Sequence, residues 1–182
     1  MLPAELTDEK IMLKVKEGNL SELSELFDRY HLKLFNFFWR LTMDRSVSED
    51  LTQTLFYRIM KYRHAFQAEQ GNFKSWMYRM ARNIHLDYCQ EQAKRPDRYK
   101  TPHELDHAAP VSEYKDQEEH LVRLDKALGR LDPEQLEIIV LSRFQGLKYD
   151  EISQIKDLSV SAIKVRMHRA IKELREHYFN TL

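Results

Sequence analysis

The chain has 182 residues, 32% of them charged and 42% hydrophobic, and its 29 basic residues balance its 29 acidic ones. With 4 glycines and 5 prolines it has few of the turns that a many-stranded protein needs, which favours helices. The sequence has no run of about 18 apolar residues and no apolar segment of a signal peptide near its start, so we expect a cytoplasmic protein. The single cysteine, Cys89, excludes an internal disulfide.

The first half of the chain predicts helices over about residues 8–17, 20–41, 46–64 and 73–92, because apolar residues recur there at steps of three and four. Thr7 is expected to cap the first helix. Ser46 and Glu49 have the spacing of a capping box, which predicts that the third helix begins there. The fourth helix, which follows Gly71, is the most aromatic.

The second half begins with a segment, 94–117, in which the helical period fails and prolines interrupt the chain; this predicts a linker. Helical periodicity resumes at Leu121, and Asp132 followed by proline is a typical helix start. A short helix over about 149–155 and a last helix capped by Ser159 are joined by a tight turn, the pattern of a helix-turn-helix. We therefore predict an all-α fold of two small helical domains, 1–93 and 118–182, on a flexible linker.

The last helix is predicted to have an apolar face, with Ile163 and Met167, and an opposite face with Lys164, His168 and Arg169. A basic helix face is usually only solvated surface. Here the face belongs to the second helix of a helix-turn-helix, which enters the DNA major groove in many DNA-binding proteins. Arginine and lysine donate to guanine or phosphate, so the context favours duplex binding.

In the fourth helix aromatic residues alternate with cationic ones, a combination that suits unpaired nucleic acid because bases stack on aromatic rings. Trp76 lies on the apolar stripe and is better explained as core. Tyr78, Arg79 and Arg82 fall off the stripe and are the better candidates for contact, and Asn83 adds an amide.

The sequence gives little support for an enzyme or a metal site. His103 and His107 are four residues apart, but they lie in the proline-interrupted linker without a zinc-binding signature. Glycine-rich phosphate loops and Gly-x-Ser-x-Gly motifs are absent. We expect no catalytic residue, no cofactor and no metal.

Several stretches resemble a known family. Residues 27–30, 48–56 and 71–83 resemble region two of the extracytoplasmic-function sigma factors of bacterial RNA polymerase. Residues 131–134, 146–152 and 160–170 are similar to region four of the same family. The motifs follow one another in the family's order and cover nearly the whole chain outside the linker.

The resemblance implies a promoter-specificity subunit that binds the clamp and the flap of core RNA polymerase and initiates transcription on promoter DNA. The third helix would dock on the clamp of the largest subunit through Glu49, Asp50, Gln53 and Thr54. The fourth helix and the loop before it would capture unpaired bases of the minus-10 element through Trp76, Tyr78, Arg79, Arg82 and Asn83. The last helix would read the minus-35 duplex through Lys164, Val165, Arg166, His168 and Arg169. An anti-sigma factor is a further candidate partner.

Three positions depart from the family pattern. Asp157 replaces the glycine of the helix-turn-helix turn, and we expect the turn to survive because Asp tolerates the left-handed conformation. Lys148 replaces a capping Ser or Thr, which weakens the cap by roughly 1 kcal/mol. Thr54 replaces an acid on the clamp-binding face. The simpler interpretation, which we prefer, is a tolerated substitution; the alternative is a kinase that restores the charge at Thr54 by phosphorylation.

Two other functions are compatible with the pattern. One is a helix-turn-helix regulator that binds duplex DNA without the polymerase. The other is a degenerate sigma-like protein that occupies the polymerase or an anti-sigma factor and does not open DNA.

Overall fold

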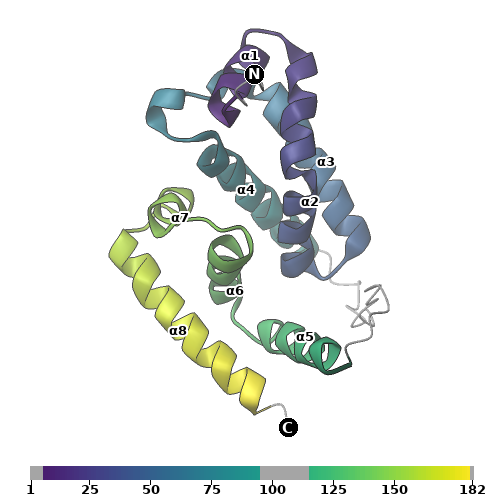
Figure 1. Ribbon diagram of the computed structural model, residues 1–182, viewed down its shortest axis with the longest axis vertical. Coiled ribbons are helices and arrows are strands. Elements are labelled where there is room, and N and C mark those ends of the chain that lie inside the picture. Colours follow the sequence, from purple (N-terminus) through teal and green to yellow (C-terminus); the bar gives the residue numbers. More distant parts are fainter. Residues whose placement is uncertain (1–5, 95–114, 181–182) are drawn as a thin grey trace, which may run out of the picture. The chain divides into compact units, whose positions relative to one another are not determined.

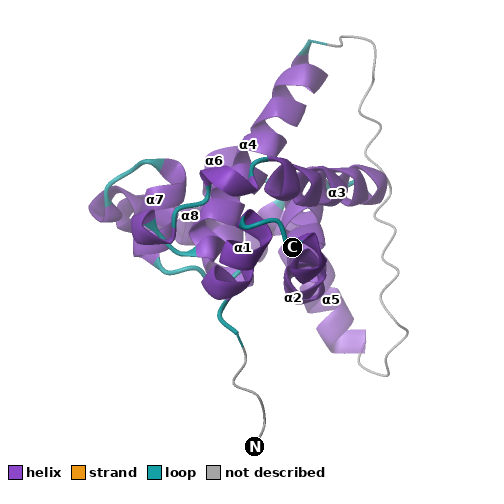
Figure 2. Ribbon diagram, turned by 90° about the horizontal axis from the view of Figure 1, so that it is seen from above, coloured by secondary structure: helices purple, strands orange, loops and turns teal. Residues whose placement is uncertain are grey.

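The computed structural model describes residues 6–94 and 115–180, which are helices joined by loops (Figures 1 and 2). The chain divides into two compact units, the first containing α1 to α4 and the second containing α5, α6, α8 and most of α7. The described part of the chain has no strand, in agreement with the predicted all-α fold. The helices are α1 (Asp8–Lys16), α2 (Leu23–Thr42), α3 (Arg45–Lys61), α4 (Phe73–Ala93), α5 (Lys115–Leu128), α6 (Pro133–Ile139), α7 (Tyr149–Lys156) and α8 (Val160–Phe179).

The core of the first unit is rich in aromatic rings. Phe37 of α2 packs edge-on against Tyr78 of α4, with ring centroids 5.5 Å apart. Phe66 lies in the loop before α4 and is 1% exposed, and its ring contacts those of Phe73 and Trp76. Because such rings bury large areas, they hold both the helices and the loop in place.

The third helix begins earlier than the sequence predicted. Its N-cap is Asp44, whose carboxylate accepts a hydrogen bond from the backbone N–H of Val47 at 3.0 Å. Ser46 lies inside the first turn, and Glu49 pairs with Arg45 at 3.0 Å instead of closing a capping box. The predicted box was therefore wrong: the carboxylate of Asp44 takes the capping position, where negative charge is favoured by the helix dipole.

The second unit buries apolar residues from α5, α6, α7 and α8, and α8 contacts both α5 and α6. Asp132 caps α6 as predicted, accepting from the N–H of Glu134 at 2.8 Å while the Gln135 side chain accepts from the N–H of Asp132. A π-helical turn, Val140–Phe144, follows α6, and Gly146 then adopts a φ of 65° that favours glycine. These features bring the chain to the start of the helix-turn-helix.

The helix-turn-helix turn has the predicted left-handed residue, since Asp157 adopts φ 54° and ψ 48°. The N–H of Leu158 donates to the carbonyl of Ser153 at 3.1 Å, which closes the end of α7. Lys148 gives α7 no capping oxygen, but its own backbone N–H donates to the Glu151 carboxylate at 2.8 Å. One half of a capping box thus remains despite the lysine.

Residues 95–114, most of the predicted linker, lie outside the described residues, as do His103 and His107. α5 begins at Lys115, somewhat before the periodicity that predicted it. Among the described helices, none combines the length and the apolar character needed to cross a membrane.

Candidate nucleic-acid interface

The helix α8 separates an apolar face from a basic one. Ser159 caps the helix by accepting from the N–H of Ala162 at 3.1 Å. Ile163, Met167 and Ala170 are buried. The opposite face is exposed, and it consists of Lys164, Val165, His168 and Arg169. These four side chains form a surface, here called the α8 face, that lies outside the buried core. Three of them, Lys164, His168 and Arg169, can donate hydrogen bonds to the phosphates or base edges of duplex DNA.

Arg166 differs from its neighbours on α8 because it already has a partner. Its guanidinium lies 2.9 Å from the carboxylate of Glu134 in α6. Both side chains are partly exposed, at 38% and 64%. An exposed ion pair contributes about 0–1 kcal/mol, so a phosphate can replace Glu134 at little cost. The predicted phosphate contact of Arg166 thus requires an exchange of partners.

On α4, Trp76, Arg79 and Asn83 follow one another at steps of three and four and share one side of the helix. Arg79 and Asn83 are exposed, and Trp76 is half-buried with its ring against Phe66 at 5.5 Å. We call this surface the α4 face. Arg82 lies at its margin and is half-buried. The face combines an aromatic ring, a cation and an amide, the groups that stack on and hold an unpaired strand.

Tyr78 does not belong to this face. Its side chain is fully buried, and its ring packs against Phe37. Burial raises the pKa of the Tyr78 hydroxyl above its ordinary value, since the ionised form would lose its hydration. The expectation that Tyr78 lies off the buried stripe was wrong. α4 packs against α3 and α1, and the ring of Phe37 in α2 also reaches it, so its buried arc is wider than one stripe and includes Tyr78.

Trp76 departs from its prediction in the opposite sense. The sequence favoured a core position, but the ring is only half-buried and lies at the boundary between core and surface. Its packing on Phe66 and Phe73 fixes one side of the indole while part of it remains accessible. A ring held in this way loses little conformational entropy when a base stacks on it.

The exposed side of α3 contains the residues predicted to contact the polymerase. Asp50 and Gln53 are exposed, Thr54 is half-buried, and Glu49 lies at the margin in its ion pair with Arg45. All four lie on the side of α3 opposite the residues that it buries, such as Leu51, Leu55 and Ile59. The predicted docking surface is therefore accessible within the first unit.

Comparison with known proteins identifies both units. Residues 26–95 match the family model described as sigma-70 region 2, and residues 121–174 match the one described as sigma-70, region 4. The chain belongs to the sigma-70 family. Over 158 residues it is 27% identical to the ECF RNA polymerase sigma factor SigX of Bacillus subtilis, covering 84% of this chain and 81% of the relative.

Two solved structures share the fold of this sigma factor. One is CnrH in complex with the cytosolic domain of CnrY, with a TM-score of 0.74, 22% identity and coverage of 96% of this chain and 99% of the other. The second is the sigma factor RpoE from Bartonella quintana in complex with the anti-sigma factor NepR, with a TM-score of 0.70, 21% identity and coverage of 87% and 98%. The two family models and relatives such as SigX, rather than these structures, identify the protein as an extracytoplasmic-function sigma factor that directs RNA polymerase to promoters. Sigma factors are DNA-binding initiation factors and not enzymes in themselves.

Sequence reasoning overlooked one residue of the sigma factor's α3 surface. Tyr57 is 56% exposed and lies one turn beyond Gln53, on the same side as Asp50. The ammonium group of Lys61 lies 5.9 Å from the centre of its ring. Exposed tyrosines are enriched in protein interfaces, so Tyr57 joins the candidate polymerase contacts. Its spacing from Asp50 and Gln53 was the signal that could have revealed it.

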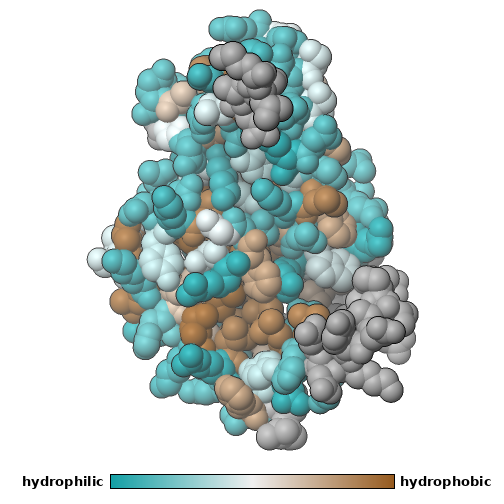
Figure 3. Space-filling model, in the orientation of Figure 1, coloured by the Kyte–Doolittle hydropathy of each residue, from teal (hydrophilic) through white to brown (hydrophobic). Residues whose placement is uncertain are grey.

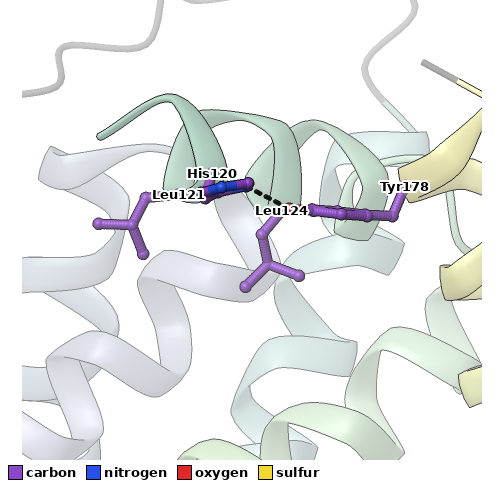
Figure 4. A pocket seen from close by; sticks show the side chains of 4 residues that line it. All are labelled: His120, Leu121, Leu124 and Tyr178. Carbon is purple, nitrogen blue, oxygen red and sulfur yellow. Dashed lines mark hydrogen bonds between the residues drawn. The ribbon is translucent and has the colours of Figure 1, made fainter. Parts of the chain in front are cut away.

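A separate apolar hollow of about 510 Å³ lies between α5 and α8 and is lined by His120, Leu121, Leu124 and Tyr178 (Figure 4). The His120 ring nitrogen Nδ1 and the Tyr178 hydroxyl are hydrogen-bonded at 2.7 Å. Apolar side chains are also visible on this side of the second unit in Figure 3. Tyr178 is at the opposite end of α8 from Lys164, so the hollow is distinct from the α8 face. Among the described residues, no cluster of three or more potential metal ligands occurs.

Proposed function

We propose that this sigma factor reads the minus-35 element as duplex DNA through the α8 face. The observation that carries the proposal is the separation of the two sides of α8, where the core uses Ile163 and Met167 and leaves Lys164, His168 and Arg169 exposed. The helix follows a tight turn at Asp157, as expected for the second helix of a helix-turn-helix. Val165 is 51% exposed between these donors and is suited to contact with a thymine methyl group.

The α4 face is proposed to capture unpaired bases of the minus-10 element. Trp76 offers a ring for stacking, Arg79 a charge for the backbone and Asn83 an amide for a base edge. Arg82 is placed to assist from the margin. Tyr78 is assigned a structural role, since its ring is buried in the core of the first unit. In this arrangement residues 1–93 act as region two, 94–117 as the tether and 118–182 as region four.

Core RNA polymerase is the proposed protein partner, reached in the cytoplasm where transcription takes place. Asp50, Gln53 and Thr54, with Glu49 at the margin, would dock on the clamp of the largest subunit, and the flap would provide a second contact. An anti-sigma factor is proposed as a regulator, since RpoE of Bartonella quintana was solved with the anti-sigma factor NepR. A kinase acting at Thr54 is the alternative regulator. This alternative rests only on the replacement of the family's acidic residue by Thr54.

Run-off transcription by purified core enzyme and this protein on a promoter library tests the proposal. We expect promoter-specific transcripts that require the protein, and permanganate-reactive thymines around the minus-10 element. Changing Arg79 and Asn83 together to alanine should reduce that reactivity while duplex binding persists. A protein that binds duplex promoters equally well without the core enzyme would instead be a plain regulator. One that binds the core enzyme but never opens DNA would be a degenerate sigma-like protein.

A further inference from the structure

The helix α1 makes two polar contacts with the segment that leads into α4, and these contacts enclose the loop of residues 67–72. At one end, the Lys16 ammonium group donates to the backbone carbonyl of Phe66 at 2.8 Å. At the other end, the Glu9 carboxylate accepts from the backbone N–H of Phe73 at 3.1 Å. Both contacts are partly buried and join residues 50 and 64 positions apart in the chain. One helix thus fixes both ends of one loop.

The contact with Phe73 completes the cap of α4. Asn72 accepts from the N–H of Ser75 at 2.7 Å, which leaves the first N–H of the helix, that of Phe73, for Glu9. The first N–H groups of a helix lack partners within the helix, and a negative charge beside them is favoured by the helix dipole. Glu9 therefore supplies from another helix what a local capping residue cannot.

The helix α1 is itself firmly held, so it can serve as a fixed reference for the loop. Ile11, Met12 and Val15 are completely buried. The hydroxyl of Tyr30 in α2 donates to the Asp8 carboxylate, and burial followed by this contact raises the pKa of Tyr30 above its ordinary value. In the structure α1 packs directly against the turn Arg63–Ala65 and against α4 (Figure 1).

A 3-10 turn, Ala68–Gln70, forms the middle of the loop. Gln67 and Glu69 are exposed, and Gly71 adopts a φ of 154° that side-chain-bearing residues rarely use. Phe66 anchors the loop's start through its ring, which contacts the rings of Phe73 and Trp76. Small changes at the two ends would move the loop relative to Trp76 and Arg79, since all of them adjoin the start of α4.

We infer that Glu9 and Lys16 are positioning residues for minus-10 recognition: they set the path of the loop of residues 67–72 relative to the α4 face without touching DNA themselves. This inference rests on the proposed role of α4 and its preceding loop. It assigns to α1 a part in base preference, because the geometry of a recognition surface depends on the groups that support it.

The test uses holoenzyme reconstituted from core polymerase and full-length protein, with a promoter library randomised at the minus-10 element. The variants are Glu9→Ala and Lys16→Met, with Glu9→Gln and Lys16→Arg as the conservative changes that keep an acceptor and a donor. Lys14→Met is the matched control, since Lys14 lies on the same helix but pairs with Glu22 at 3.1 Å, away from the loop.

We expect Glu9→Ala and Lys16→Met to reduce the preference for the best minus-10 sequences over the poorest by about fivefold to tenfold, as for the loss of a charged hydrogen bond. The conservative variants and Lys14→Met should keep the wild-type preference. Amide exchange of Phe73 in the isolated protein should accelerate in Glu9→Ala, a readout that does not depend on DNA.

A uniform loss of transcription at all sequences, in proportion to a lower melting temperature, would overturn the inference because it indicates only weaker folding. An unchanged preference in both variants would overturn it as well. The Arg79→Ala variant separates these results from a failure of the proposed function. If Arg79→Ala alters minus-10 preference and the α1 variants do not, only the inference fails; if neither does, the proposed role of α4 fails too.

Discussion

The α8 face and the α4 face differ in how closely each is tied to the core. On α8 the apolar side is buried and the basic side is exposed, so the residues proposed for recognition differ from those that form the core. On α4 the aromatic ring proposed to stack on an unpaired base, Trp76, also packs on Phe66, and the tyrosine two residues later is wholly buried. The difference suits the two targets. A duplex presents fixed edges to projecting donors, whereas an unpaired base needs a flat, rigid ring, and a ring is made rigid by packing.

The largest expected effect tests whether Tyr78 of α4 belongs to the core. Tyr78→Ala removes a fully buried ring and should lower the free energy of unfolding by about 3–5 kcal/mol. Urea denaturation followed by circular dichroism measures it. Tyr78→Phe keeps the ring and is the matched control, and it should open promoters like the wild type. Defective promoter opening in a normally stable Tyr78→Phe protein would show that the hydroxyl acts on DNA and that the core assignment is incomplete.

Changes on the α8 face should affect recognition without affecting folding. Lys164→Ala and Arg169→Ala are each expected to weaken duplex binding by about 1–3 kcal/mol if the side chain contacts a base edge. Binding of the core enzyme and the urea midpoint should remain at wild-type values, because neither side chain is buried. Fluorescence anisotropy with a labelled minus-35 duplex and holoenzyme provides the measurement. Equal transcription from every promoter after both changes would remove the recognition-helix assignment.

Arg166 sharpens the comparison because, unlike the residues of the α8 face, it forms an ion pair with Glu134 of another helix. Arg166→Ala should reduce the slope of log affinity against log salt by about 1 if the side chain contacts a phosphate. Glu134→Gln releases the guanidinium and should tighten duplex binding by at most about 1 kcal/mol. A salt titration of both variants is sufficient. If Arg166→Ala leaves the slope unchanged, the arginine serves only to join α8 to α6.

The smallest effect concerns Thr54, a half-buried position on the surface of α3 that is proposed to dock on the polymerase. Thr54→Glu should bind core polymerase more tightly than Thr54→Ala by up to about 1 kcal/mol. A carboxylate that pairs with an arginine across a protein interface helps to align the two surfaces. Thr54→Gln controls for side-chain size. Biolayer interferometry with immobilised core enzyme measures the affinities. If the unmodified protein already binds as tightly as Thr54→Glu, the phosphorylation hypothesis fails and the substitution is simply tolerated.

Local rules were sufficient for much of this protein. The period of apolar residues predicted the helices and the exposed side of α8. A helix that packs on one side only has its apolar residues on that side, so their spacing shows which side faces solvent. Thr7, Asp132 and Ser159 cap the predicted helices, and Asp157 takes the left-handed turn, since these preferences depend on a few adjacent residues. The family resemblance added the assignment to sigma factors, which the helical period alone does not contain.

Tertiary structure decided what depends on more than one neighbour. Tyr78 is buried because α1 and α3 pack on α4 and Phe37 of α2 reaches its ring, and a single-stripe pattern does not show a helix with several packed sides. Arg166 meets Glu134, and Glu9 meets Phe73, across 32 and 64 positions of sequence. Such contacts form only when helices distant in the chain come together. The sequence therefore determined the helices and the outward side of α8, while the packing of helices determined which aromatic residue of α4 faces solvent and which charges already have partners.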